Sequence, residues 1–204
     1  MSNESQNNKR LAKNTLILYA RMLFTVGISF YSTRLILVNL GVSDYGVYNV
    51  IGGFVSMFYM VTATMTQAVS RFLTFELGKG DEKRLQQTFS TSVNILLLLA
   101  LIVVLLGETV GLWFINAKLN IETERMVAAN WIYQFSLFAF VFEMFSVPYS
   151  ASVISHEKMD TFAFVTIAKV LLTLGIALLL VISPIDKLIF YGILVFIVSV
   201  SIQL

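Results

Sequence analysis

The chain has 204 residues, of which 57% are hydrophobic and only 13% are Asp, Glu, Lys or Arg. An ordinary soluble domain carries about 25% charged residues, and so few polar side chains could not cover its surface. The composition therefore excludes a disordered chain, a nucleic-acid-binding protein and a water-soluble globule, and the net charge of +2 indicates no strongly anionic partner. Since a membrane-spanning helix needs about 20 apolar residues, the length allows about five to seven spans.

Six stretches of low charge follow one another after a polar segment of residues 1–13. The predicted spans are residues 14–38, 45–70, 86–114, 127–150, 162–183 and 187–204. They are too long and too continuously apolar for barrel strands, in which apolar and polar side chains alternate. The sequence thus predicts an all-α integral membrane protein, a bundle of six transmembrane helices. The last stretch is still apolar where the sequence stops, which favours a truncated chain.

Short connections predict that consecutive helices are antiparallel neighbours. Only residues 71–85 are numerous enough to form structure of their own, and within them Asp81 is followed by an acid and two bases, the charge order of a helix start. Pro148 is expected to mark the exit of the fourth span. The spacing of Gly107 and Gly111 fits a motif for close helix contact, but its position at the end of a span favours a chance match.

The distribution of basic residues predicts that both termini lie in the cytoplasm. With the amino terminus inside, the inner segments hold eight Lys or Arg residues and the outer segments at most four, and basic residues favour the cytoplasmic side. The eight are Lys9, Arg10, Lys13, Arg71, Lys79, Lys83, Arg84 and Lys158. Six spans then return the carboxyl terminus to the same side.

Signals for catalysis, metal binding and cofactor binding are missing from the sequence. The chain has no Cys and one His, which excludes disulfides and thiol chemistry and disfavours a histidine metal site. It contains no phosphate-binding loop, no nucleophile elbow and no dinucleotide-binding fingerprint. We therefore expect no enzymatic activity, no cofactor and no metal.

Five charged residues lie inside the predicted spans: Arg21, Arg34, Glu108, Glu143 and Lys169. Ionisable groups in a membrane usually face the interior of a bundle or a cavity. At a rise of 1.5 Å per residue, the two basic residues Arg21 and Lys169 and the acid Glu143 each lie roughly 10 Å from the inner face. The other two lie near the outer interface. The common depth of three charges predicts a polar site in the cytoplasmic half of the bundle.

Two interpretations of these charges remain open. In the structural one, Glu143 and Lys169 neutralise each other, while Arg21, Arg34 and Glu108 reach the lipid headgroups with their long side chains. In the functional one, Arg21 and Lys169 face a cavity and bind the phosphates of a lipid, because a guanidinium group forms paired hydrogen bonds with phosphate oxygens.

The segment Leu40–Tyr48 carries a more specific signal. With Gly41, Tyr45 and Gly46 in place, it resembles the LG-x-x-x-(Y/F)-G-x-(Y/F) signature of polysaccharide-lipid flippases. These are the O-antigen and capsule repeat-unit transporters of the multidrug/oligosaccharidyl-lipid/polysaccharide exporter superfamily. Residues Gln67–Phe72 are similar to the next recurring element of that family, and the likeness covers essentially the whole chain.

The resemblance implies a mechanism and a place in the cell. Such flippases have two six-helix lobes around a cavity that opens alternately to either side. They carry undecaprenyl-diphosphate sugars across the bacterial cytoplasmic (inner) membrane for cell-surface polysaccharides such as the O-antigen of lipopolysaccharide. Residues Ala20–Leu23 resemble the start of the first helix in the related peptidoglycan-precursor flippases. By position, Arg21 matches a cavity arginine of those flippases, and Arg34 matches another arginine of their first helix. Glu143 and Lys169 have no family motif behind them.

The number of spans departs from the family pattern. These transporters carry about twelve to fourteen helices in two related halves, so this chain resembles the amino-terminal lobe alone. The implied partners are the membrane lipid, the lipid-linked oligosaccharide, and a missing carboxyl-terminal lobe or a second copy of the chain.

Two other functions remain open. A drug/cation antiporter of the same superfamily commonly uses carboxylates in its lobe helices, and here the first two spans hold none, which leaves Glu143 as the candidate. A non-transporting membrane scaffold protein would instead point Arg21 and Lys169 toward lipid.

Overall fold

The structure, a computed structural model, describes residues 3–156 and 159–203. That part of the chain is helical apart from short connections and holds no strand. In order, the elements are α1 (Asn3–Leu40), α2 (Val42–Ser56), α3 (Tyr59–Lys79), α4 (Glu82–Leu106), the π-helical turn η1 (Gly107–Gly111), α5 (Leu112–Lys118), η2 (Thr123–Arg125), α6 (Met126–Ser155), α7 (Met159–Leu179), η3 (Leu180–Ile182) and α8 (Lys187–Gln203). The all-α prediction is confirmed, while Lys158 and Leu204 lie outside the described residues.

The helices match the predicted spans in number and order. Five helical stretches are long and apolar enough to cross a membrane, and α8 is a shorter apolar helix of 17 residues. The second stretch consists of α2 and α3 with a break at Met57 and Phe58 between them. The prediction of a membrane-spanning helical bundle is thereby confirmed.

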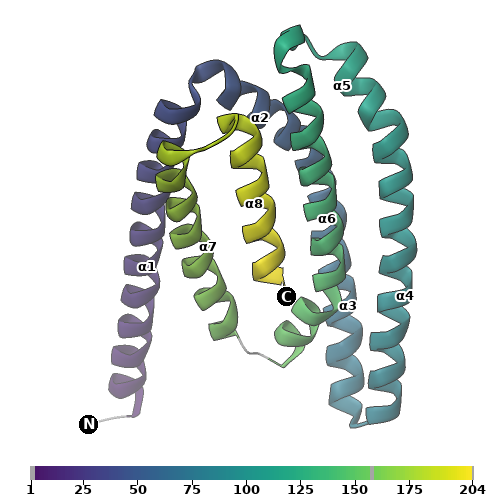
Figure 1. Ribbon diagram of the computed structural model, residues 1–204. Helices are drawn as coiled ribbons and strands as arrows, with labels where there is room; N and C mark the ends of the chain where they lie inside the picture. Colours follow the sequence, from purple (N-terminus) through teal and green to yellow (C-terminus); the bar gives the residue numbers. More distant parts are fainter. Residues whose placement is uncertain (1–2, 157–158, 204) are drawn as a thin grey trace.

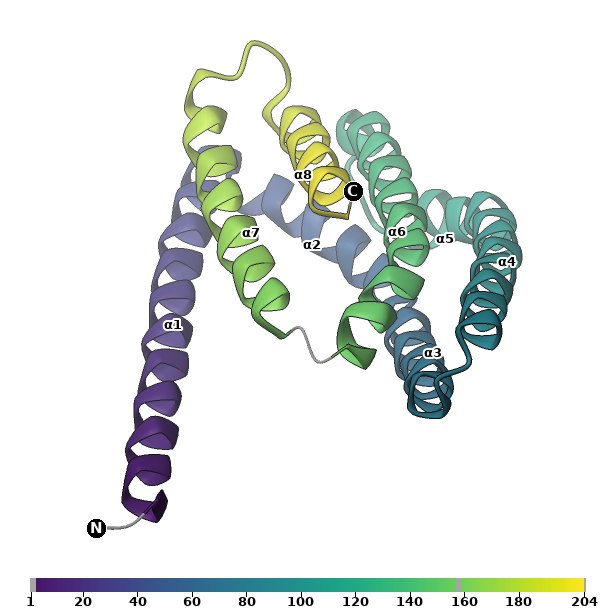
Figure 2. The ribbon, with the colours of Figure 1, turned by 90° about the horizontal axis from the view of Figure 1, so that it is seen from below.

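Helix α6 lies at the centre of the bundle. It packs against α2, α3, α4 and α8, and Ile132, Tyr133, Leu137, Phe140 and Met144 on it are fully buried. Helices α1 and α7 lie side by side on one flank, and the α3–α4 hairpin lies on the other (Figures 1 and 2). The amino terminus and the α3–α4 turn share one end of the bundle, called here the amino-terminal end. The α1–α2 junction and the starts of α6 and α8 lie at the opposite end, called the far end (Figure 1).

The connection predicted at residues 71–85 is wrong, because α3 continues to Lys79 and α4 already begins at Glu82. The chain turns within two residues. Gly80 has a φ of 70°, a left-handed conformation that glycine adopts without steric cost. The Asp81 side chain then accepts a hydrogen bond of 3.0 Å from the backbone amide of Arg84. This contact caps α4 and confirms the helix start predicted at Asp81.

The prediction that Pro148 marks a helix exit is also wrong. Pro148 lies buried inside α6, which continues to Ser155. A proline removes one backbone hydrogen bond from a helix. Helices in membrane bundles tolerate this loss because packed neighbours hold the helix on both sides of the proline.

The two glycines of η1 form a real helix contact, so the expectation of a chance match is wrong. The Tyr133 hydroxyl on α6 donates a hydrogen bond of 2.8 Å to the carbonyl oxygen of Gly107. A Cβ atom on Gly111 would collide with the same hydroxyl. The glycines therefore allow η1 to lie directly against the Tyr133 ring, which is itself fully buried.

Replacing Gly111 with Ala should displace Tyr133 and break its hydrogen bond. We expect destabilisation by about 1–3 kcal/mol, the usual cost of overpacking a core. Gly175→Ala in α7 is the matched control, because nothing lies within 4 Å of a Cβ atom there. Since glycine weakens a helix interior, this control should leave stability unchanged or raise it by up to about 1 kcal/mol. Thermal unfolding of the purified protein in detergent measures both, and equal midpoints for the two variants would contradict the packing described.

Candidate functional site

Helix α1 presents a polar stripe beside α7. Arg21, Thr25, Ser29 and Thr33 recur every four residues and therefore share one face of α1. Between the two helices lies a surface cavity of about 440 Å³. Its lining residues are Thr25, Val26, Ser29, Phe30 and Thr33 of α1 and Thr166 and Val170 of α7. We call this cavity the α1–α7 groove.

The three predicted cations are not lining residues of this cavity, but each lies within one turn of a lining residue on α1 or α7. Arg21 is half-buried one turn before Thr25, and its backbone carbonyl oxygen accepts a hydrogen bond of 3.0 Å from the Thr25 hydroxyl. Lys169 is exposed and lies between the two lining residues of α7, while Arg34 is exposed beside Thr33. Thirteen residues of helix separate Arg21 from Arg34, or roughly 20 Å. Within the described residues none of the three forms a salt bridge.

Glu143 lies half-buried on α6 and faces neighbouring helices rather than lipid alone. Its carboxylate accepts a long hydrogen bond of 3.5 Å from the Gln203 side-chain amide of α8, and the Tyr59 hydroxyl of α3 is a further partner. Lys169 acts on this carboxylate electrostatically, but the two do not approach within the 4.0 Å of a direct ion pair. The structure thus brings Glu143 and Lys169 near each other without a direct contact.

Glu108, the other acid inside a span, is held by the protein. It is half-buried in η1 and accepts a hydrogen bond of 3.1 Å from the Gln134 side chain of α6. A protein donor therefore replaces the lipid headgroup contact considered for this residue.

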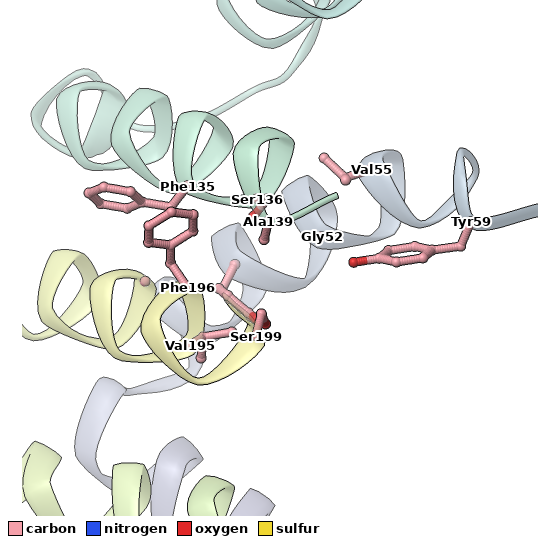
Figure 3. Close-up of a pocket in the computed structure, with 11 residues that line it drawn as sticks. Gly52, Val55, Tyr59, Phe135, Ser136, Ala139, Val195, Phe196 and Ser199 are labelled. Atoms are coloured by element: carbon pink, nitrogen blue, oxygen red, sulfur yellow. The ribbon is translucent and has the colours of Figure 1, made fainter. Parts of the chain in front are cut away.

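A small pocket lies between α2, α6 and α8 (Figure 3), and Tyr59, a partner of Glu143, is one of its lining residues. Its volume is about 160 Å³, and its lining is mostly aromatic or small, with hydroxyls from Ser136 and Ser199. Figure 3 shows the Tyr59 hydroxyl directed toward this space. Ser136 and Glu143 are seven residues apart and share a face of α6, and Gln203 follows Ser199 by one turn of α8. Glu143 therefore lies close to the pocket without being one of its lining residues.

Three charged residues form an ion cluster at the far end. The Arg125 Nε atom lies 3.0 Å from Asp44 Oδ1, and the Arg125 Nη1 atom lies 2.6 Å from Asp186 Oδ2. The other oxygen of Asp186 accepts hydrogen bonds from the amides of Leu188 and Ile189, at 3.0 and 3.2 Å, and so caps α8. We call Asp44, Arg125 and Asp186 the far-end ion cluster. It joins the starts of α2, α6 and α8.

The flippase-like motif builds the corner that holds this cluster. Gly41 joins α1 to α2 with a φ of 81°, a conformation that other residues rarely adopt. Tyr45 and Gly46 are half-buried in the first turns of α2. Asp44, which occupies a variable position of the motif, is buried and faces Arg125.

Sequence reasoning missed the cluster as a site. Arg125 entered only the count of basic residues, and neither Asp44 nor Asp186 was a candidate. One signal was available: two acids and a base flank three predicted spans on the same side of the membrane, where they are able to meet. The described residues include no group of three or more His, Asp or Glu that could hold a metal ion.

Comparison with known families gives one match. The family model described as MatE matches residues 18–181, from the first span into η3. The chain belongs to the MatE family. MatE proteins are part of the multidrug/oligosaccharidyl-lipid/polysaccharide exporter superfamily, and they are membrane transporters rather than enzymes. No curated protein and no solved structure matches the chain. Membership of MatE thus confirms the predicted superfamily and the class of multi-pass membrane transporter.

Asp186 should make the stability of this MatE protein sensitive to acid. Burial raises its pKa, but the Ile189 amide, the Arg125 guanidinium and the Leu188 amide outweigh that effect and hold the pKa below the ordinary 3.8. The ionised carboxylate therefore stabilises the fold above about pH 3.8, and this contribution is lost as the pH falls through the lowered pKa. Thermal unfolding in detergent between about pH 5 and 3 should show a steeper loss for the wild type than for Asp186→Asn. Parallel curves would contradict the role given to this carboxylate.

Proposed function

We propose that the protein moves a lipid-linked oligosaccharide, an undecaprenyl-diphosphate sugar, across the bacterial cytoplasmic membrane for cell-surface polysaccharide biosynthesis. One observation carries the proposal. The α1–α7 groove is lined by hydroxyls, and Arg21, Arg34 and Lys169 lie on the same two helices within one turn of its lining residues. No described carboxylate lies within salt-bridge distance of these cations. A groove of this kind favours an anionic, sugar-bearing lipid.

The chemistry of each part of the groove suits one part of that substrate. A guanidinium such as that of Arg21 offers paired hydrogen bonds to phosphate oxygens, and the Lys169 ammonium offers a mobile point charge. The threonine and serine hydroxyls are able to donate to and accept from sugar hydroxyls. The apolar members Val26 and Phe30 suit the polyprenyl chain. Attraction between opposite charges is strong where lipid and protein exclude water.

The same proposal includes an orientation and a partner. The amino terminus shares one end of the bundle with the basic α3–α4 turn, which carries Lys79, Lys83 and Arg84 (Figure 1). Basic connections favour the cytoplasm, so we place both termini inside. Alternating access needs a second wall opposite the groove. A second six-helix lobe, or a second copy of the chain, is the proposed partner that supplies it.

Flipping of a fluorescent undecaprenyl-diphosphate sugar by the protein in vesicles tests the proposal. Arg21→Gln and Lys169→Gln should each lower the rate about tenfold or more, because a hydrogen bond to a charged group contributes about 1.5–3 kcal/mol. Lys118→Gln is the matched control. It removes an exposed cation that lies 5.5 Å from the Trp113 ring, away from the groove, and should leave the rate unchanged. A full rate from an Arg21→Gln protein that inserts normally would contradict the proposal.

Glu143 favours a second candidate, the drug/cation antiporter. A carboxylate near an aromatic-lined pocket attracts organic cations, and Tyr59, a partner of Glu143, and Phe196 line that pocket. The nearby charge of Lys169 opposes cation binding, which is why we rank this function second. If it held, Glu143→Gln would abolish export of ethidium from the same vesicles, and Arg21→Gln would not. Membership of a transporter family argues against the third alternative, a membrane scaffold.

A further inference from the structure

The far-end ion cluster connects the helices that carry the polar groups around Glu143. Arg125 immediately precedes α6, which carries Glu143, and Asp186 caps α8, which carries Gln203. Asp44 lies in the first turn of α2, which leads into α3 and Tyr59. The cluster thus lies at another level of the same helices as Glu143 and Gln203, while Tyr59 begins α3 beyond the break that ends α2. A shift of any helix start would be transmitted along a rigid helix to the residue it carries.

The contact between these helices at the far end depends on the charge of Arg125. The amino-terminal ends of three helices meet there, and each carries a partial positive charge. Arg125 adds a full positive charge, and the two carboxylates compensate for the sum. The Asp44 side chain is only 8% exposed, so water cannot take the place of its partner. Glu122 also acts electrostatically on Asp44 and on Arg125, and its negative charge would further disfavour Asp44 if the guanidinium moved away.

Within the described residues, no other salt bridge joins different helices. The remaining one, between Arg84 and Asp81, lies within the first turn of α4 and is largely exposed, with 65% and 43% of the two side chains accessible. Arg125 instead pairs with Asp44, 81 positions earlier in the sequence, and with Asp186, 61 positions later. Removing one partner of a buried ion pair leaves an uncompensated charge.

We propose that Arg125 is a positioning residue for transport, which keeps the starts of α2, α6 and α8 together throughout the transport cycle. The three helices then move as one body, and Glu143 of α6 and Gln203 of α8 keep their relative position while the protein changes its access. The inference needs only the transport activity of the family and holds for an anionic or a cationic substrate. The opposite possibility is a gate that opens and closes at the far end in each cycle.

Cross-linking separates a permanent contact from a gate, and the chain offers a clean background because it has no Cys. Asp44→Cys and Arg125→Cys are combined in one protein and joined by a short bifunctional thiol reagent. A disulfide alone would bridge Cα atoms only about 4.4–6.8 Å apart, whereas the reagent replaces the length of the arginine side chain. Transport of the fluorescent undecaprenyl-diphosphate sugar and of ethidium is measured before and after the cross-linking reaction. The probe that the wild-type protein transports is the one that tests the inference.

We expect the unlinked double variant to transport on the order of tenfold more slowly, because small displacements of positioned groups have large effects on rate. The cross-link should restore the wild-type rate within about twofold. If this contact had no role in transport, the cross-link would not restore the rate. If the cross-linked protein is inactive, the far end opens during the cycle and the inference is wrong. It is equally wrong if the unlinked variant transports at the full rate.

Two further variants control the experiment. Asn116→Cys with Asn130→Cys joins α5 to α6 through a pair that is hydrogen-bonded at 3.0 Å at the same end of the bundle. The same reagent should leave transport by this protein unchanged. If the cysteine pair at the cluster prevents folding, the Arg125→Lys variant is used to test the inference. Lysine keeps the positive charge but cannot contact both carboxylates as the rigid guanidinium fork does. Reduced transport by Arg125→Lys supports the inference, and a full rate overturns it.

Discussion

Lipid offers no hydrogen bonds, so each polar side chain inside this bundle needs a partner from the protein or access to water. Helix α6 supplies such partners to many of the polar side chains in the bundle. From one end to the other, it and the residue before it supply partners to neighbouring elements: Arg125 to Asp44 and Asp186, Asn130 to Asn116, Tyr133 to Gly107, Gln134 to Glu108, and Glu143 to Gln203. Each pair also fixes how far α6 is shifted along its neighbour. The central position of α6 thus follows from its polar residues as much as from its apolar ones.

Helices α1 and α7 lie outside this set of contacts. Their basic residues Arg21, Arg34 and Lys169 form no salt bridge with a described residue, although an unpaired charge in a membrane is costly. The bundle therefore holds two polar regions of opposite character. One is the hydroxyl-lined α1–α7 groove with basic residues near it, and the other is the aromatic pocket lined by Tyr59, a partner of Glu143. Lys169 lies near both, since it precedes Val170 in the lining of the first and acts electrostatically on Glu143, whose partner Tyr59 lines the second. Its position makes the sign of the transported charge the main functional question.

The sequence predicted those features that depend on local composition. Long apolar stretches predicted the helices, Asp81 predicted the start of α4, and the segment around Gly41 indicated the superfamily. Features that depend on a distant partner escaped prediction. Pro148 is tolerated because of packing around α6, and the glycines of η1 have meaning only opposite Tyr133. The far-end ion cluster joins residues up to 142 positions apart in the sequence, Asp44 and Asp186, through Arg125. Counting residues along single helices placed Arg21 and Lys169 at one depth, but it took the packing of α1 on α7 to relate both to one groove.

The preference between anionic and cationic substrates is open to direct measurement. Binding of a fluorescent undecaprenyl-diphosphate sugar to the purified protein in detergent can be competed with undecaprenyl diphosphate or with tetraphenylphosphonium, a lipophilic cation. If the α1–α7 groove holds the substrate, undecaprenyl diphosphate will displace the labelled lipid and tetraphenylphosphonium will not. Failure of the labelled lipid to bind, together with saturable binding of tetraphenylphosphonium, would contradict the flippase function and favour the antiporter.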